Sequence, residues 1–393
     1  MTDVVELALL AFTLLAQDPP PAPPPSTTAS PPAAADRRAQ RLVRVAAELE
    51  AECAAVAAFD REKEFAAALE RGLAEVGGAR WWKIGDGALP RWTLQNWLQW
   101  HRPQEGRELP GALDVALEGH PFGAIVDLAQ QLAAHRIEFL FVCFPSRVEC
   151  YPELVLPELA GPSIPANPAD PAPASDRPPF RGMVGQNPRF LAELTKAGVE
   201  VVDLAPVFAE QRVAEGDERR RLLYLRGNTH WTPRGAELAA NVVAARLAGM
   251  EWFEPGPSRE GESFQIKRRL TIFRGEGVGQ AIGEPSEPVA VDAVEPLGAP
   301  PDAAQARASP ILLLGDSFCR VHVEQKASFA DQLLRFTGWP IDVIAPNGGV
   351  ELTCRDSFAR RGDGAAGKKV VIWLMPEASL VPSGLFKKVE VLR

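Results

Sequence analysis

The feature that most constrains the fold of this chain is an alternation of short apolar runs with amphipathic segments between residues 121 and 376. Continuous apolar runs are typical of strands buried on both faces of a sheet. Segments with helical spacing separate them, and some end at Gly198, Gly249 or Gly338, where we expect left-handed caps. The alternation predicts an α/β fold with a doubly wound, mostly parallel sheet. The runs are "IEFLFVCFP" (137–145), "VEVVDLA" (199–205), "SPILLLGD" (309–316), "IDVIAP" (341–346) and "KKVVIWLMP" (368–376).

The N-terminal part of the chain has a different composition. Its apolar run "ELALLAFTLLA" is too short to span a bilayer but has the length of a signal-peptide core. Asp3 and Glu6 stand where a secretory signal usually carries Lys or Arg. We expect residues 1–17 to be a signal or anchor segment of an exported, periplasmic protein. Residues 18–35, rich in Pro, Ser and Ala, are expected to form an extended linker.

The rest of the chain, residues 36–393, is expected to form one domain that begins with an N-terminal helix over 36–77. A stretch dense in proline at 154–188 is expected to be a long loop. Residues 251–310 are expected to be an irregular insertion, with a small antiparallel excursion around "SFQIKRRLTIF" (263–273).

Charge and cysteine content exclude several classes of function. The net charge is −9, and the Lys and Arg residues are scattered along the sequence, so we expect no nucleic-acid partner. The five cysteines lack CxxC spacing, and we interpret them as buried small hydrophobic residues rather than disulfides or zinc ligands. Nothing in the sequence indicates a metal, a nucleotide or another cofactor.

A serine follows one of the predicted strands. In "ILLLGDSF" (311–318), the strand ends in a tight turn that carries Ser317 at its carboxyl end. Parallel α/β sheets bind ligands at this edge. A serine exposed there, beside the N–H groups of a turn, suits a nucleophile with an oxyanion site. Gly-Asp-Ser is also a frequent turn sequence, so the motif alone does not establish catalysis.

A histidine stands at the start of a predicted helix. In "THWTPRGAEL" (229–238), Thr232 suits the N-cap and Pro233 the first helical position, so His230 lies just before the helix. A serine hydroxyl needs a neighbouring base to take its proton, and His230 is a candidate for that base. A lone histidine is also often structural. The spacing leaves open whether Ser317 and His230 meet.

These motifs together resemble those of the SGNH-hydrolase-like domain of the AlgJ/AlgX-like alginate O-acetylation proteins. The resemblance rests on "GDSF", "THWTPRGAELAA", "FPSRVECYPEL", "NGGVEL" and "VVIWLMPE" and runs from about Trp82 to Met375. It implies an SGNH-type fold with Ser317 as nucleophile and His230 as its base. The oxyanion hole would be formed by Ser317 with Gly348 and Gly349. The resemblance also implies that Arg147, Tyr151 and Trp231 bind the substrate.

One position departs from the family's pattern. The family signature is Asp-x-His-Trp-Thr, whereas this chain has Asn228 two residues before His230. An asparagine accepts a hydrogen bond from the imidazole but supplies no charge, and the equivalent change in a serine protease costs about 10⁴ in turnover. Asp316 and Asp203 are alternative acids, although Asp316 is also suited to bracing the serine turn.

Two functions therefore remain open. The first is a polysaccharide O-acetyltransferase or acetylesterase of SGNH type that acts through an acyl-serine, on a polysaccharide or another acetylated glycan. The second is a catalytically degenerate member that binds a glycan or partner proteins of an acetylation or secretion complex. Ser317 and His230 favour the first function, and Asn228 favours the second.

Overall fold

The computed structural model describes residues 34–57, 62–77, 81–84, 87–101, 119–156, 187–212, 222–258, 260–274, 286–346, 353–380 and 386–392. The predicted segment 1–17, nearly all of the linker 18–35 and most of the loop 154–188 lie outside these residues. Within the described part, no helix combines the length and the apolar character that crossing a membrane requires.

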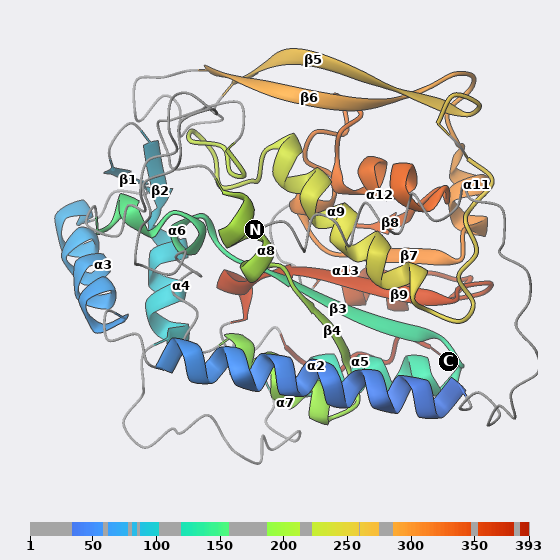
Figure 1. Ribbon diagram of the computed structural model, residues 1–393, viewed down its shortest axis with the longest axis horizontal. Coiled ribbons are helices and arrows are strands. Elements are labelled where there is room, and N and C mark those ends of the chain that lie inside the picture. The colour runs from blue at the N-terminus through green and yellow to red at the C-terminus, as the bar shows by residue number, and fades with distance from the viewer. Residues whose placement is uncertain are drawn as a thin grey trace, which may run out of the picture. The chain divides into compact units, whose positions relative to one another are not determined.

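A parallel sheet of five strands forms the core, in the order β4-β3-β9-β7-β8 (Figure 1). Each strand comes from one of the five apolar runs in the sequence. The doubly wound parallel sheet predicted from the alternation is confirmed. The strands are β3 (Glu138–Phe144), β4 (Glu200–Asp203), β7 (Ile311–Leu314), β8 (Asp342–Ile344) and β9 (Val370–Pro376).

Helices cover both faces of the sheet (Figure 1). Successive side chains of β3 point to opposite faces, with Phe141 in one buried cluster and Val142 in the other. Both clusters exclude water, which explains why the strands read as continuous apolar runs. One face packs against α2 (Ala34–Ala57), α5 (Pro121–Ala134), α7 (Asn187–Lys196) and α13 (Thr353–Ala359), and the other against α8 (Ala205–Gln211), α9 (Pro233–Ala248) and α12 (Phe329–Thr337).

The N-terminal region differs from the prediction of one helix over 36–77. It contains two helices, α2 and α3 (Glu62–Val76), followed by an antiparallel pair, β1 (Trp81–Ile84) and β2 (Gly87–Pro90), and by α4 (Arg91–His101). Phe65 of α3 and Leu94 of α4 share a small cluster with Val148. This cluster packs these elements against the segment that follows β3.

The glycine caps are confirmed in two of three cases. Gly198 has φ +87° and Gly338 has φ +73°, both in the left-handed region. Gly249 has φ −84°, so the left-handed cap predicted there is wrong. Its amide donates to the carbonyl oxygens of Arg246 and Leu247, so α9 ends in right-handed geometry.

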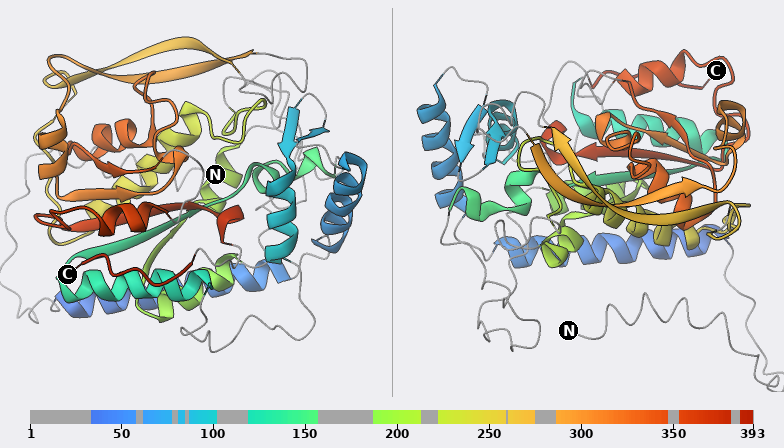
Figure 2. Two further views of the ribbon diagram at one scale, coloured as in Figure 1. Left: turned by 180° about the vertical axis from the view of Figure 1, so that it is seen from behind. Right: turned by 90° about the horizontal axis from the view of Figure 1, so that it is seen from above.

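A long antiparallel ribbon occupies part of the predicted irregular insertion. β5 (Phe264–Arg274) pairs with β6 (Ser286–Pro296) along 11 residues, a longer excursion than the sequence suggested, and α11 (Ala303–Ala308) follows. The inner face of the β5–β6 ribbon buries Val291. On its outer face, Arg268 bonds to Asp292 at 2.8 Å across the strands. Figures 1 and 2 show the ribbon lying over the face of the domain that carries α9 and α12.

Candidate active site

Ser317 lies in a tight turn at the carboxyl end of β7. The strand ends at Leu314, and a short 3₁₀ helix spans Ser317–Cys319. A Cβ atom at Gly315 would overlap Sγ of Cys319 and stand 3.0 Å from the carbonyl oxygen of Leu374, so only glycine allows this close approach. The carboxylate of buried Asp316 accepts a hydrogen bond from the Phe318 amide at 2.8 Å. Asp316 therefore braces the turn that presents Ser317.

His230 is fixed by the loop that precedes α9. Leu225 N donates to the carbonyl oxygen of His230 at 2.9 Å, and Thr232 N donates to that of Leu223 at 2.8 Å. The Thr232 hydroxyl caps α9 by accepting from Gly235 N at 3.2 Å, as its position in the sequence predicts. The backbone of His230 is therefore held between these two hydrogen bonds and the capped start of α9.

The two predicted catalytic residues meet although 87 positions separate them in the chain. His230 Nε2 lies 2.8 Å from the hydroxyl oxygen of Ser317. On the other side of the ring, Nδ1 lies 2.7 Å from Oδ1 of Asn228. The structure thus forms a continuous hydrogen-bonded series from Asn228 through His230 to Ser317.

Asn228 is oriented so that its oxygen faces the imidazole. The same Oδ1 accepts from the amides of Thr229 at 2.6 Å and His230 at 3.3 Å, which an NH₂ group could not do. Because Oδ1 only accepts, the proton of a neutral His230 must be on Nδ1. Nε2 is then free to receive the Ser317 proton. Asn228 therefore selects the tautomer that an aspartate would select, and lacks only the negative charge.

The environment of His230 favours its neutral form. Burial lowers the pKa of His230 to about 4. The ring of Phe318 packs against the imidazole with centroids 4.7 Å apart. At neutral pH the imidazole is thus unprotonated and able to act as a base, but an imidazolium formed during a reaction would receive little stabilisation.

The oxyanion-hole prediction falls partly outside the described residues. Gly348 and Gly349 belong to the part of the chain that the structure does not describe. The amide of Ser317 has no hydrogen-bond partner among the described residues. That N–H group is therefore available to a developing oxyanion at the nucleophile.

The three residues implied as substrate ligands are buried, which departs from the prediction that they contact the substrate. Arg147 donates to the carbonyl oxygen of Arg226 at 2.8 Å, and the Tyr151 hydroxyl accepts from Leu223 N at 2.8 Å. The Trp231 indole packs edge-on against Phe318, with centroids 5.3 Å apart. In this structure, Arg147, Tyr151 and Trp231 support the loop that carries His230.

Asp203 also differs from its candidate role as a relocated acid. It ends β4, which β3 and β9 separate from β7 in the sheet. With strands about 4.8 Å apart, Asp203 stands roughly 14 Å from the strand that carries the serine. Its carboxylate accepts from Ala205 N at 2.9 Å and so begins α8.

Two supporting residues were not identified from the sequence. His322 lies behind the site and bonds to the backbone of Trp231. Glu287 of β6 accepts from the amides of Arg226 and Gly227 at 3.1 and 3.4 Å, which fixes the start of the Asn228 loop. The position of His322 five residues after Ser317 is a signal that could have been used. No local pattern points from Glu287 to a loop 60 residues earlier.

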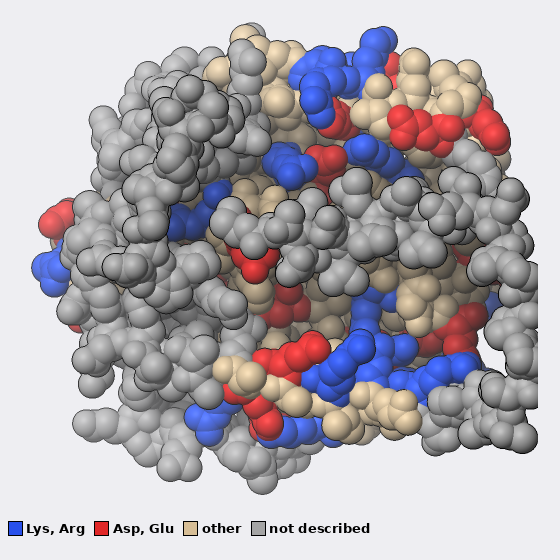
Figure 3. Space-filling model, in the orientation of Figure 1, with Lys and Arg blue, Asp and Glu red and all other residues tan. Residues whose placement is uncertain are grey.

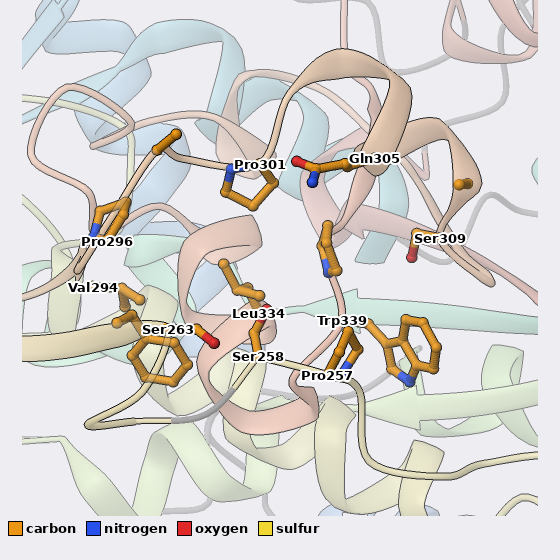
Figure 4. A pocket seen from close by; sticks show the side chains of 14 residues that line it. Pro257, Ser258, Ser263, Val294, Pro296, Pro301, Gln305, Ser309, Leu334 and Trp339 are labelled. Atoms are coloured by element: carbon orange, nitrogen blue, oxygen red, sulfur yellow. The ribbon is translucent and has the colours of Figure 1, made fainter.

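A hollow of about 360 Å³ lies elsewhere, beside the start of β7 (Figure 4). It is lined mainly by apolar residues such as Leu334 and Trp339. Two of its polar side chains serve the fold, since Gln305 accepts from Asp302 N at 2.8 Å and the Ser309 hydroxyl from Ile311 N at 3.1 Å. This hollow is distinct from the Ser317 site, which follows the other end of β7.

Comparison with known proteins bears on the resemblance seen in the motifs. A family model described as "SGNH hydrolase-like domain, acetyltransferase AlgX" matches residues 120–377. The chain belongs to this family. The matched region contains the five-stranded sheet as well as Asn228, His230 and Ser317. The AlgJ/AlgX-like resemblance and the SGNH-like fold are therefore confirmed.

Individual relatives of this AlgX-family chain are distant. It is 31% identical over 182 residues to the alginate biosynthesis protein AlgX of Pseudomonas putida, covering 44% of this chain and 36% of that protein. AlgX of Pseudomonas syringae pv. tomato is 28% identical over 222 residues, with 50% and 44% covered. The chain thus spans less than half the length of both. The O-acetyltransferase domain of Pseudomonas putida AlgJ shares the fold, with a TM-score of 0.50 at 18% identity over 72% of this chain and 88% of that domain.

Proposed function

We propose that this AlgX-family chain is an exported enzyme that transfers acetyl groups to, or removes them from, polysaccharide hydroxyls through an acyl-serine. The observation that carries the proposal is the 2.8 Å contact between Ser317 Oγ and His230 Nε2, with the opposite ring nitrogen bonded to Asn228. A serine activated by a neutral imidazole of fixed tautomer is the arrangement that acyl transfer requires.

In the proposed reaction, Ser317 Oγ attacks the carbonyl carbon of an acetyl ester while Nε2 of His230 takes the hydroxyl proton. The charge on the carbonyl oxygen develops beside the Ser317 amide. Collapse of the tetrahedral intermediate breaks the bond to the leaving group, which receives the proton from His230. A sugar hydroxyl or water then gives its proton to His230 and takes the acetyl group from Ser317, and His230 returns that proton to Ser317 Oγ as the acyl-serine bond breaks.

The second candidate is a member that binds a glycan or a partner protein without chemistry. The observation in its favour is Asn228, because the His230 imidazolium formed during transfer has no carboxylate at Nδ1. The fixed tautomer of His230 argues against this candidate, since a site without a catalytic role does not need to orient Nε2 toward Ser317.

The test is acetylation of the protein by a chromogenic acetyl ester, followed by peptide mass analysis. We expect a burst of chromophore and an acetyl group on the Ser317 peptide. Ser317→Ala should lose both, whereas Ser357→Ala, a half-buried serine of α13, should keep both as the matched control. If the parent and Asn228→Asp both remain unlabelled while an acetylated polysaccharide still binds, the second candidate is favoured.

A further inference from the structure

The fold gathers basic side chains that the sequence keeps far apart. A hollow of about 720 Å³ lies at the edge of the sheet where β3 and β9 begin, which is the edge opposite to Ser317. The C-terminal end of the described chain lies beside it (Figures 1 and 2). We call it the basic hollow, because Asp363 is the one acid among its lining residues. Its lining cations are Arg136, Arg360, Arg361, Lys368 and Lys369.

Two of these cations form its floor. The side chain of Lys368 is 1% exposed, and its Nζ lies 2.7 Å from Oδ2 of Asp342 and 2.8 Å from the carbonyl oxygen of Ser309. Arg361 contacts the same Asp342 oxygen at 2.6 Å and Asp363 at 2.5 Å. These contacts engage both acids and fasten the segment 361–368 to the first residue of β8. The floor is therefore preorganised before any ligand arrives.

The other three cations, Arg136, Arg360 and Lys369, are exposed. None of them has an acidic partner in the part of the chain that the structure describes, and Arg360 contacts only the Ser357 hydroxyl, at 3.5 Å. Among the described residues, the basic hollow thus presents three positive charges without an acidic partner, in a chain whose net charge is −9. Lys267, Arg268 and Arg269 of the β5–β6 ribbon differ, since each of these three is bonded to Asp292 or Glu295, and Figure 3 shows acidic side chains beside the basic ones there.

The chemistry of the basic hollow fits carboxylates spread along a polymer. Guanidinium groups pair with carboxylates through two parallel hydrogen bonds. A small phosphate is usually held by converging backbone N–H groups, whereas here the cations stand on side chains from two separate segments around an open hollow. At about 3.3 Å per residue, the seven residues of β3 place the two sheet edges roughly 20 Å apart, so only an extended ligand can occupy both.

We propose that the basic hollow binds an acidic polysaccharide, with sugar carboxylates paired to Arg136, Arg360 and Lys369. This inference rests on the proposed function and deepens it. One stretch of the polymer is held at this edge of the sheet while another stretch, on the same chain of sugars, reaches Ser317. The basic hollow adds affinity and takes no part in the transfer step.

The test is binding of an unacetylated polyuronate to the full chain, with neutral dextran of similar size for comparison. The variant R136Q/R360Q/K369Q should bind polyuronate at least about tenfold more weakly, because exposed ion pairs each contribute a few-fold. It should turn over a small chromogenic acetyl ester at the parental rate. The matched variant K267Q/R268Q/R269Q removes three exposed cations from the ribbon and should change the affinity by less than about threefold.

Three other outcomes would overturn the inference. Equal weakening by both triple variants would mean that net charge alone attracts the polymer, and no weakening would mean that it binds elsewhere. Displacement of polyuronate by an equal charge concentration of inorganic phosphate would identify a small-anion site. A fourth outcome separates the two proposals. If the parent shows no ester turnover, yet R136Q/R360Q/K369Q binds polyuronate more weakly than the parent, the proposed function is refuted and this inference stands.

Discussion

His322 donates a hydrogen bond from Nε2 to the carbonyl oxygen of Trp231 across 2.8 Å. A carbonyl oxygen only accepts, so the proton of the imidazole is on Nε2, and burial lowers the pKa of His322 to about 4. Phe273 of β5 packs on the imidazole with centroids 4.5 Å apart. Since His322 follows Ser317 and Trp231 follows His230 in the chain, this bond joins the two segments that carry the proposed reaction.

Replacement of His322 by leucine is expected to lower kcat for acetyl-ester turnover with little change in KM. The change leaves the buried Trp231 carbonyl unsatisfied, at a cost of about 1–3 kcal/mol, and frees the segment next to His230. A displacement of about 1 Å in such a site can cost about 10²-fold in rate.

The control is His322→Asn, because the φ of +73° at this position suits asparagine and its amide can still donate. It should keep more of kcat than the leucine variant. Equal kcat for the parent and both variants would show that the bond stabilises the fold without positioning His230.

Replacement of Asn228 by aspartate is expected to raise acetyl-ester turnover by about tenfold or more. The carboxylate would accept the same proton from Nδ1 and add a charge that stabilises the imidazolium. It should also raise the pKa of His230, so the acid limb of the kcat/KM profile should move to higher pH. Stopped-flow measurement of chromophore release across pH tests both effects. A variant no faster than the parent would mean that charge at Nδ1 does not limit this site.

The sheet could be predicted because the burial of each strand is visible in the residues of that strand alone. Each strand is buried on both faces, so runs such as 137–145 and 368–376 are apolar throughout. The ends of these strands also place Ser317 correctly, since a parallel sheet has one carboxyl edge. The left-handed cap predicted at Gly249 was wrong because a helix can also end with right-handed geometry. A glycine in the sequence does not distinguish the two kinds of helix end.

Contacts between distant segments could not be predicted in the same way. Spacing did not show that His230 meets Ser317, and only the resemblance to a family suggested it. Arg147 and Tyr151 carry polar groups that are usual in binding sites, yet the fold uses both groups to bond backbone atoms of buried loops. The basic hollow is likewise invisible in the sequence, because Arg136 and Lys369 come together only when β3 pairs with β9.

The stability of the fold is expected to fall as the pH drops from about 6.5 to about 4. The pKa values of His230 and His322 are lowered to about 4 by burial, below the ordinary value of 6.5. In this window the unfolded chain binds protons that the folded chain does not, so acid favours unfolding, by on the order of 3 kcal/mol for each histidine. Above pH 6.5 the two groups contribute no further pH dependence.

Urea unfolding at several pH values measures this dependence. The slope of the free energy of unfolding against pH should be smaller in His322→Asn than in the parent between about pH 4 and 6.5. Carboxyl groups titrate in both proteins, so the difference between the slopes isolates His322. Identical slopes would mean that His322 is as easily protonated in the folded state as in the unfolded state.

Substitution of Gly315 by alanine is expected to abolish acetyl-ester turnover and to destabilise the fold by about 1–3 kcal/mol, as overpacking of a core does. The new methyl group would overlap Sγ of Cys319 and approach the carbonyl oxygen of Leu374, so the turn that presents Ser317 must shift. Gly298→Ala is the matched control, because a Cβ atom there meets nothing within 4 Å. Denaturant unfolding and ester turnover should leave this control near the parent, within about 0.5 kcal/mol. Full turnover by Gly315→Ala would show that the turn tolerates the methyl group, and that the position of Ser317 does not depend on the close packing of Gly315 against Cys319.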